Sequence, residues 1–335
     1  MTTGTENRAD ERTVTCADAV QEALAEAMER DDSVIVLGED VADLQGGGIR
    51  GCTQGLSTRF GDGRVRSTPI SEQAIIGAAV GAAIAGMRPV AEIMLMNFIT
   101  VAMDQIVNHA AKTRYMSGGQ ASVPLTIRTM TGAGAGTGGQ HSDMLEAWLA
   151  HVPGLKIAVP STAADYKALL TACIFDDNPC IFIENTLQLK SKGSLIANEK
   201  PLPLGKARIV RSGSDVTLIS YGRPMIDAEK VAASLGDQGL SVELIDLRTI
   251  VPFDEETILN SVAKTGRAVV LHEAVKRFGV GAEIASRIHE ELFADLKKPV
   301  LRLGMPYTPV PFSSALEKPI LWNADKIEAA IRSLM

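Results

Sequence analysis

The chain has 335 residues, a formal net charge of −7 and a hydrophobic content of 46%. This length is enough for two domains with apolar cores of their own. The negative charge comes without any block of lysine or arginine, which argues against nucleic acid and anionic membranes as partners.

Residues 1–13 are polar and charged, which predicts a flexible tail and no signal peptide. The longest apolar stretch, residues 74–87, is too short to span a bilayer. The four cysteines lack CxxC or metal-ligand spacing, so they are expected to be buried free thiols. These features predict a cytoplasmic protein.

Apolar β-rich runs alternate with helical patterns through the first half of the chain. The expected strands are 34–37, 89–95, 123–129, 155–159 and 180–184, and the expected helices are 16–30, 72–87, 97–117 and 162–175. Continuous apolar strands separated by helices predict a mostly parallel sheet covered on both faces. We therefore expect a first domain at residues 14–190.

Residues 191–204, rich in Lys, Ser, Asn and Pro, are expected to form a linker. A second alternating series follows, with strands at 215–221, 241–247, 267–273 and 300–303, and helices at 224–235, 254–264, 281–292 and 323–334. The predicted fold class is α/β, with two three-layer α/β/α domains, the second at residues 205–335.

Glu72 is the most informative residue. It opens a helix that is apolar or small on every face after Gln73, so we expect this helix to be buried on all sides. An acid in the first turn gains from the helix dipole, but out of water it is costly without a partner. Two interpretations stay open: a capping carboxylate, or an acid kept for a protonatable nitrogen of a ligand.

Gly77 and Gly81 of the same helix lack side chains and lie four positions apart. Small residues at this spacing allow another helix, such as one of a second subunit, to approach closely. An ordinary alanine-rich core helix is the alternative.

The segment 132–139 contains five glycines, and Gly134, Gly136 and Gly139 satisfy G-x-G-x-x-G. A dinucleotide site would need an acid at the end of the strand 155–159 and a helix start after the last glycine, and neither is present. A flexible loop lining a cleft is the better interpretation. The loop leads into His141, which suits proton transfer near neutral pH, with a surface histidine as the alternative.

Met94 and Phe98 lie where an expected strand enters an expected helix. A thioether and an aromatic ring there can line a flat heterocycle, although isolated residues of these types are more often core. Glu92 is a second acid in an apolar strand and must have a partner.

Together these residues resemble the β subunit of the thiamine-diphosphate-dependent E1 component of 2-oxo acid dehydrogenase complexes. Glu72, Gly77 and Gly81 match the E-x4-G-Φ-x-x-G-Φ signature of the pyrimidine-binding domain. The likeness runs from 38–42 to 309–312, with further blocks at 68–72, 88–92, 104–106, 115–119, 140–142, 152–156, 213–217 and 245–248. It implies a thiamine-diphosphate-binding, transketolase-like pyrimidine fold followed by a transketolase C-terminal-domain-like fold.

The resemblance also implies roles. Glu72 would hydrogen-bond N1′ of the aminopyrimidine, so that the 4′ nitrogen can deprotonate the thiazolium C2. Ile70, Met94 and Phe98 would pack around the pyrimidine. His141 would act in reductive acylation of the lipoyl group.

A turn with Cys173, Ile174, Asp176 and Asn178 resembles a potassium-binding turn of some relatives, and its carbonyl and carboxylate oxygens suit such a cation. Taken alone, it is a plain turn. Gly61-Asp62-Gly63 matches only the first half of the magnesium and diphosphate motif of thiamine enzymes, so the Mg²⁺ site must come from another chain.

The assembly implied is an α2β2 heterotetramer in which the α subunit supplies Mg²⁺ and the diphosphate site. The second domain would contact a second β subunit and dock the E2 acyltransferase. The expected reaction is oxidative decarboxylation of a 2-oxo acid with acyl transfer to lipoyl-E2.

The substrate stays open. Residues 115–119 and 184–185 look closer to pyruvate-type subunits, and residues 128–134 look closer to acetoin dehydrogenase subunits, while branched-chain 2-oxo acids are a further alternative. The glycine segment replaces a bulkier one in many relatives, so a more mobile access loop is expected. A nicotinamide-dependent oxidoreductase and a scaffold without chemistry are the alternatives of other classes.

Overall fold

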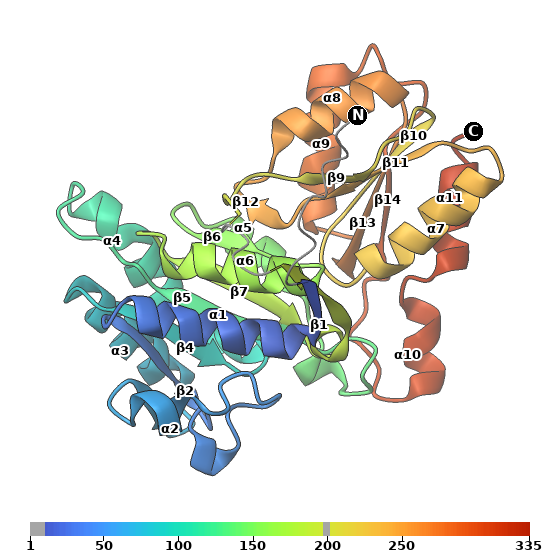
Figure 1. Ribbon diagram of the computed structural model, residues 1–335. Coiled ribbons are helices and arrows are strands. Elements are labelled where there is room, and N and C mark those ends of the chain that lie inside the picture. Colours follow the sequence, from blue (N-terminus) through green and yellow to red (C-terminus); the bar gives the residue numbers. More distant parts are fainter. Residues whose placement is uncertain (1–10, 197–201) are drawn as a thin grey trace, which may run out of the picture.

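The computed structural model describes residues 11–196 and 202–335. Within these ranges two mostly parallel sheets form the centres of two domains (Figure 1). The strands are β1 (Glu11–Thr15), β2 (Val34–Glu39), β3 (Val65–Thr68), β4 (Arg88–Ile93), β5 (Thr126–Thr131), β6 (Lys156–Ala158), β7 (Cys180–Asn185), β8 (Lys192–Ile196), β9 (Arg208–Arg211), β10 (Val216–Ser220), β11 (Val242–Asp246), β12 (Thr249–Val251), β13 (Ala268–Val275) and β14 (Leu301–Met305).

The helices lie between these strands in chain order. They are α1 (Cys16–Arg30), η1 (Asp43–Gln45), α2 (Leu56–Phe60), α3 (Glu72–Ile84), η2 (Met96–Ala102), η3 (Gln105–Ala110), α4 (Ala111–Met116), η4 (Gly139–His141), α5 (Glu146–Ala150), α6 (Ala163–Ile174), η5 (Gln188–Lys190), α7 (Met225–Asp237), α8 (Glu255–Thr265), α9 (Val280–Leu292), α10 (Ser314–Ile320) and α11 (Ala324–Arg332). None of the helices in the described ranges combines the length and the apolar character needed to cross a membrane.

The first sheet has seven strands in the order β12-β6-β7-β5-β4-β2-β3. All of its pairs are parallel except β12 with β6. Every residue of β5 and β7 is buried, as expected for central strands that helices cover on both faces. Helices α1 and α6 pack together over one face, and α3, η2 and η3 lie on the other.

Side-chain caps explain where the longer helices begin. Helix α1 starts at a capping box in which Thr15 and Asp18 bond each other's backbone N–H groups. The side chains of Thr162 and Asp254 cap α6 and α8, respectively, and each accepts a hydrogen bond from the backbone N–H three residues further along the chain. The left-handed Gly266 ends α8.

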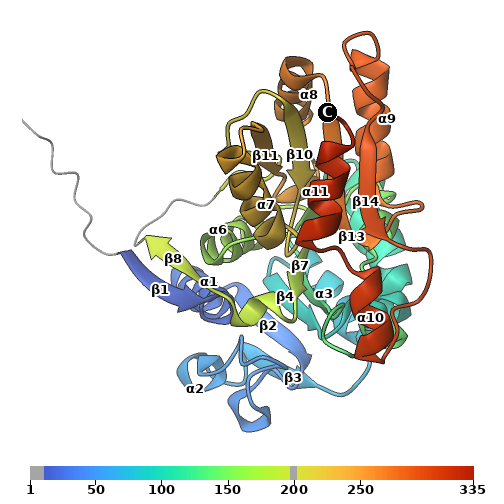
Figure 2. The same ribbon diagram turned by 90° about the vertical axis from the view of Figure 1, so that its right-hand side faces the viewer.

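The second sheet has five strands in the order β14-β13-β10-β11-β9, and only β9 is antiparallel to its neighbour. Helices α7 and α11 cover one face. Helices α8 and α9 cover the other, where Ile258 and Ile284 share one continuous apolar cluster with first-domain residues such as Ile157. The two domains therefore share one apolar core, and Figures 1 and 2 show them packed against each other in two views.

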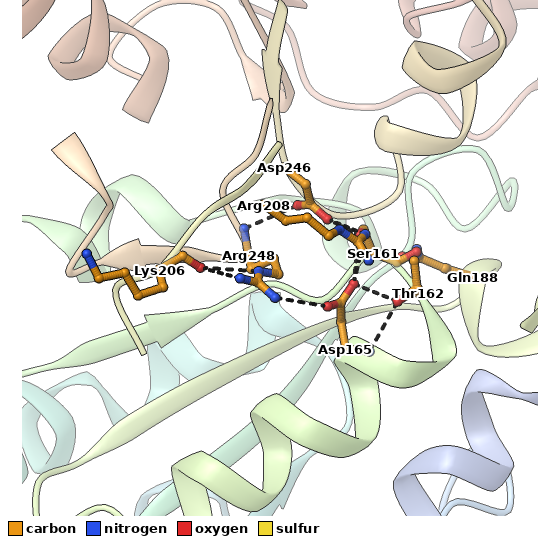
Figure 3. A network of polar contacts seen from close by, with 8 residues as sticks. All are labelled: Ser161, Thr162, Asp165, Gln188, Lys206, Arg208, Asp246 and Arg248. Carbon is orange, nitrogen blue, oxygen red and sulfur yellow. Dashed lines mark hydrogen bonds and ion pairs between the residues drawn. The ribbon is translucent and has the colours of Figure 1, made fainter. Parts of the chain in front are cut away.

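A buried polar network also joins the domains (Figure 3). Ser161 donates to Asp165 at 3.1 Å and also to Asp246, which lies at the end of β11 in the second domain. Arg208 contacts both carboxylates, at 3.4 and 3.1 Å. Arg248 adds an ion pair with Asp165 at 3.8 Å. Two buried acids thus face two arginines across the domain boundary, which partly offsets the cost of burying these charges.

The structure corrects three sequence-based predictions. Residues 11–13, expected in the flexible tail, and 192–196, expected in the linker, form β1 and β8, which pair antiparallel. The single helix expected over 97–117 is instead a 3₁₀ segment, a π-helical segment and a short α-helix. Strand β12 leaves the second-domain sequence to join the first sheet. The two strand pairings join residues far apart in the chain, and the change of helix type does not alter the apolar pattern, so local periodicity reports none of the three.

Candidate active site

The carboxyl ends of four neighbouring parallel strands, β3, β2, β4 and β5, lie at one edge of the first sheet. In open α/β sheets, ligands bind at this edge. Ile70 and Glu72 follow β3, Met94 and Phe98 follow β4, and His141 follows β5. The topology therefore brings these five residues to one edge, whereas the predicted potassium turn at 173–178 precedes β7 and lies at the opposite edge.

Glu72 is the first residue of α3 and is partly buried. The cap residue Ser71 makes no side-chain hydrogen bond, and α3 contains no recorded bond from its amides to Glu72. Among residues 11–196 and 202–335, no hydrogen bond or ion pair of the Glu72 carboxylate is found. The described contacts thus give no support to the capping interpretation.

A second acid, Glu39, lies near Glu72 at the end of β2. Burial raises the pKa of Glu39, and the negative charges of Asp40 and Glu72 raise it further. Two carboxylates close together in a partly buried place favour a shared proton or a ligand that brings one.

Helix α3 is not buried on all sides, which corrects the sequence-based expectation. Ile75, Ile76 and Ala79 pack into the core, but the opposite face, with Ala74, Gly77, Ala78, Gly81 and Ile84, is exposed. A Cβ atom built on Gly81 would meet nothing within 4 Å. No helix of the described chain therefore fills the small-residue face at this point.

The residues expected around a heterocycle differ in exposure. The side chain of Ile70 is 75% exposed, whereas Met94 and Phe98 are half-buried and pack against the core. The rings of Phe98 and His141 meet edge to face, with centroids 5.4 Å apart. Phe98 and His141, from different strand ends, are thus in direct contact.

The glycine loop before His141 is held at several points. Glu317 of α10 accepts from the N–H groups of Gly134 at 2.7 Å and Gly136 at 3.1 Å. Asn97 donates to the carbonyl of Gly139 at 3.1 Å. A dinucleotide would need such amides for its diphosphate, so their use by Glu317 argues against the nicotinamide hypothesis. The contacts also argue against a loose access loop.

Glu92 has the partner that the sequence requires. Arg128 bonds Glu92 at 2.7 Å and Glu184 at 2.7 Å, and all three side chains are at most 2% exposed. Burial raises the pKa of Glu184, and Arg128 opposes this shift. The three charged residues lie side by side on β4, β5 and β7. Of these strands, β4 leads to Phe98, β5 leads to His141, and β7 ends at Asn185.

The turn expected to bind potassium is already bound by cations. Arg88 donates to the carbonyls of Ile174 at 3.3 Å and Asp176 at 3.2 Å, and Lys156 pairs with the Asp176 carboxylate. Asn178 donates to the same carboxylate. Cys173 is buried and its carbonyl accepts from the Asp176 N–H. As it stands, the turn does not fit an added cation, and the potassium prediction stays untested.

Sequence analysis missed several residues of this region. Glu39 ends a buried strand, and that position was a usable signal. Glu146 is fully buried, accepts from Tyr221 at 2.9 Å and has its pKa raised by burial to about 8. Glu317 lies 181 positions or more from the loop that it binds, so no local pattern could identify it.

Two family models match the chain. The model described as transketolase, pyrimidine binding domain, matches residues 12–192, and the model described as transketolase, C-terminal domain, matches residues 205–327. A solved structure titled "Split gene transketolase, inactive beta4 tetramer" is similar in fold, with a TM-score of 0.79 and 22% identity, covering 96% of this chain and 98% of that one.

Curated relatives are similar over nearly the whole chain. The pyruvate dehydrogenase E1 component subunit beta of Rhizobium meliloti is 45% identical, covering 96% of this chain and 70% of the relative. The acetoin:2,6-dichlorophenolindophenol oxidoreductase subunit beta of Cupriavidus necator is 43% identical, covering 95% and 96%. The 2-oxoisovalerate dehydrogenase subunit beta of Bacillus subtilis is 41% identical, covering 95% and 97%.

The two matched domains, the two-sheet α/β fold and these relatives agree with one another. The chain belongs to the transketolase-like family of thiamine-diphosphate enzymes, among the E1 β subunits of pyruvate, acetoin and branched-chain 2-oxo acid dehydrogenases.

Proposed function

We propose that this chain binds the aminopyrimidine of thiamine diphosphate and works with an α subunit in oxidative decarboxylation of a 2-oxo acid, pyruvate in the first place. The observation that carries the proposal is Glu72, a partly buried acid beside Glu39, without a recorded partner in the described chain. A pyrimidine nitrogen that shares a proton is the kind of partner that such a carboxylate lacks.

Thiamine diphosphate, when bound, supplies the nucleophilic carbon for decarboxylation. Glu72 would hold a proton at N1′ of the pyrimidine, and the nearby Glu39 favours a protonated ligand by adding negative charge. Phe98 and Met94 would give the ring an apolar wall, and the exposed Ile70 would close it from the side of the partner.

His141 would donate a proton to the thiolate that leaves when the lipoyl disulfide opens. Its contact with Phe98 supports this role, because it sets the imidazole beside the residue proposed to line the cofactor. The acyl acceptor would be a lipoyl group of an E2 acyltransferase, which corresponds to an oxidoreductase of the EC 1.2.4 type.

The proposed assembly is an α2β2 heterotetramer with Mg²⁺ and the diphosphate site on the α subunit. The exposed small-residue face of α3 supports subunit contacts, as do Tyr115 and Met116, which are 87% and 76% exposed. Cys16, Cys52, Cys173 and Cys180 are all free and buried, which fits the proposed cytoplasmic location.

The test is Glu72→Gln in the β chain, co-expressed with its α subunit. Gln removes the proton-sharing charge but keeps the size of the side chain, so we expect pyruvate-dependent dye reduction to fall by about 100-fold or more. Glu256→Gln, which changes a side chain that is 78% exposed, is the matched control. Unchanged turnover in the Glu72 variant, with assembly intact, would end the proposal.

Acetoin and branched-chain 2-oxo acids are the second candidates, because relatives with those names are 43% and 41% identical to this chain. The ratio of kcat/KM for pyruvate, acetoin and 2-oxoisovalerate in the same assay decides among them.

A further inference from the structure

We infer that Glu317 of the second domain is a positioning residue that holds the glycine loop, and through it His141, in place for acyl transfer. The inference rests on the role proposed for His141. It concerns a residue of α10, whose sequence neighbours belong to the other domain.

Glu317 contacts the glycine loop directly. Glu317 is 2% exposed, and each of its two carboxylate oxygens accepts from a different amide of the loop, at 2.7 and 3.1 Å. Gly134 and Gly136 have φ values of +89° and +69°. This left-handed backbone, which favours glycine, lets both N–H groups point at one carboxylate.

The loop also lies on other parts of the second domain. Arg223 donates to the carbonyl of Ala133 at 3.2 Å, and its guanidinium stacks over Trp322 at 5.3 Å. A Cβ on Gly138 would meet Phe312 at 3.5 Å. In both ribbon views α10 lies below the second sheet, beside the first domain (Figures 1 and 2). Glu317 is therefore part of a platform for this loop.

The glycine loop in turn holds the backbone of His141. Thr137 contacts the Ser142 hydroxyl at 2.8 Å, and the His141 N–H donates to the Gly138 carbonyl at 3.2 Å. No hydrogen bond or ion pair of the His141 ring is found among residues 11–196 and 202–335, where its recorded ring contact is Phe98. The place of the imidazole therefore depends on the backbone that carries it.

Hydrogen bonds from N–H groups to an ionised carboxylate are stronger than neutral ones. The amide of a glutamine has only one oxygen, so its NH₂ group would face one of the two loop N–H donors. We call the two hydrogen bonds from Gly134 and Gly136 to Glu317 the clamp. Glu317→Gln breaks it while nearly conserving the side-chain volume, and Glu317→Ala removes it.

Hydrogen exchange tests the clamp in the intact enzyme. In Glu317→Gln we expect the amides of segment 132–139 to exchange about 10-fold faster or more, as expected for loss of a charge-assisted bond. Glu328→Gln, which removes a half-exposed acid of α11, is the matched control and should leave the segment unchanged. Arg223→Gln, which removes the contact with Ala133, should also speed exchange.

Acceptor choice tests positioning. With an artificial dye as acceptor, Glu317→Gln should keep turnover within about twofold of the wild type, because Glu72 is untouched. With a lipoylated E2 domain, kcat should fall about 10-fold while KM changes little. A purely structural defect would lower both activities together.

The outcomes separate this inference from the proposed function. Unchanged exchange in both Glu317 variants overturns the clamp, whatever the enzyme does. Faster exchange with equal loss, or no loss, for both acceptors overturns positioning. If the wild type transfers no acyl group to lipoyl domains, the role of His141 fails and positioning fails with it, while the exchange result still decides the clamp.

Discussion

Buried titratable side chains in this protein differ in what compensates the cost of their burial. Arg128 meets two acids directly, so its triad can stay ionised in the core. His272 on β13 is fully buried without such a partner in the part of the chain that the structure describes. Cβ atoms placed on Gly279, Gly281 and Gly304 would come within 2.8 Å of its ring. Glycine at these three positions makes room for the imidazole.

This site makes stability depend on pH. Burial and, to a smaller extent, the charge of Arg302 lower the pKa of His272 to about 4. The unfolded chain takes up a proton near pH 6.5 and the folded chain does not, so stability is fully present above that pH and is lost as the pH falls towards 4. By pH 5.5 the loss is about 1 kcal/mol.

His272→Leu should remove this contribution. We expect its free energy of unfolding, from urea titrations at pH 7.5 and 5.5, to fall less than that of the wild type by about 1 kcal/mol. An equal change in the free energy of unfolding between pH 7.5 and 5.5 in the two proteins would contradict the assignment. The change with pH is compared, and not the free energy at one pH, because leucine also alters packing.

Among the elements, helix α3 begins with the candidate site residue Glu72 and also has an exposed face of apolar and small residues. Its apolar and small residues extend around the helix, but only one face packs within the chain. The sequence could predict an all-apolar helix, because that is a property of residue order. It could not predict which face stays exposed, because a single helix pattern does not say which side the rest of the chain covers.

Gly81→Leu tests this face. The isolated β chain should fold as stably as the wild type or up to about 1 kcal/mol more so, because a Cβ at this position meets nothing and leucine favours helix more than glycine does. The α2β2 assembly should weaken, because the leucine fills space that a neighbouring subunit needs. Sedimentation of the α and β chains together measures the assembly, with Ala329→Leu, at an exposed position of α11, as the control. Full assembly would show that this face stays free.

The short elements were predicted less well than the long ones. Helix α1 begins and ends where the sequence predicts, because Thr15 and Asp18 form a local capping box. The 97–117 region carries a similar apolar pattern, but its hydrogen bonds shift from 3₁₀ to π to α geometry. Residue period alone does not distinguish these ladders.

At the scale of the whole molecule, two domains share a core and a buried polar network. Burial and, to a smaller extent, the neighbouring Asp165 raise the pKa of Asp246 to about 7 against the opposing effects of Ser161, Arg208 and Arg248. A group with a raised pKa gives stability that is present below about pH 4 and is lost as the pH rises towards 7. The domain boundary is therefore expected to weaken towards neutral pH.

Asp246→Asn should remove that dependence. The difference in free energy of unfolding between variant and wild type is expected to move in favour of the variant from about pH 4 to about pH 7, then to level off. Urea denaturation across this range measures it. A difference that does not change with pH would mean that the network stays ionised, held by its two arginines.

Sequence by itself determined the α/β class, the order of the long helices and strands, and the acid Glu72 at the start of an apolar helix. These follow from local periodicity and from the cost of an unmatched charge, both of which adjacent residues carry. Tertiary structure alone decided that Glu39 stands near Glu72, that Phe98 meets His141, and that Glu317 holds the glycine loop. Each of these contacts joins residues that chain order separates, and only the packing of sheets and domains brings them together.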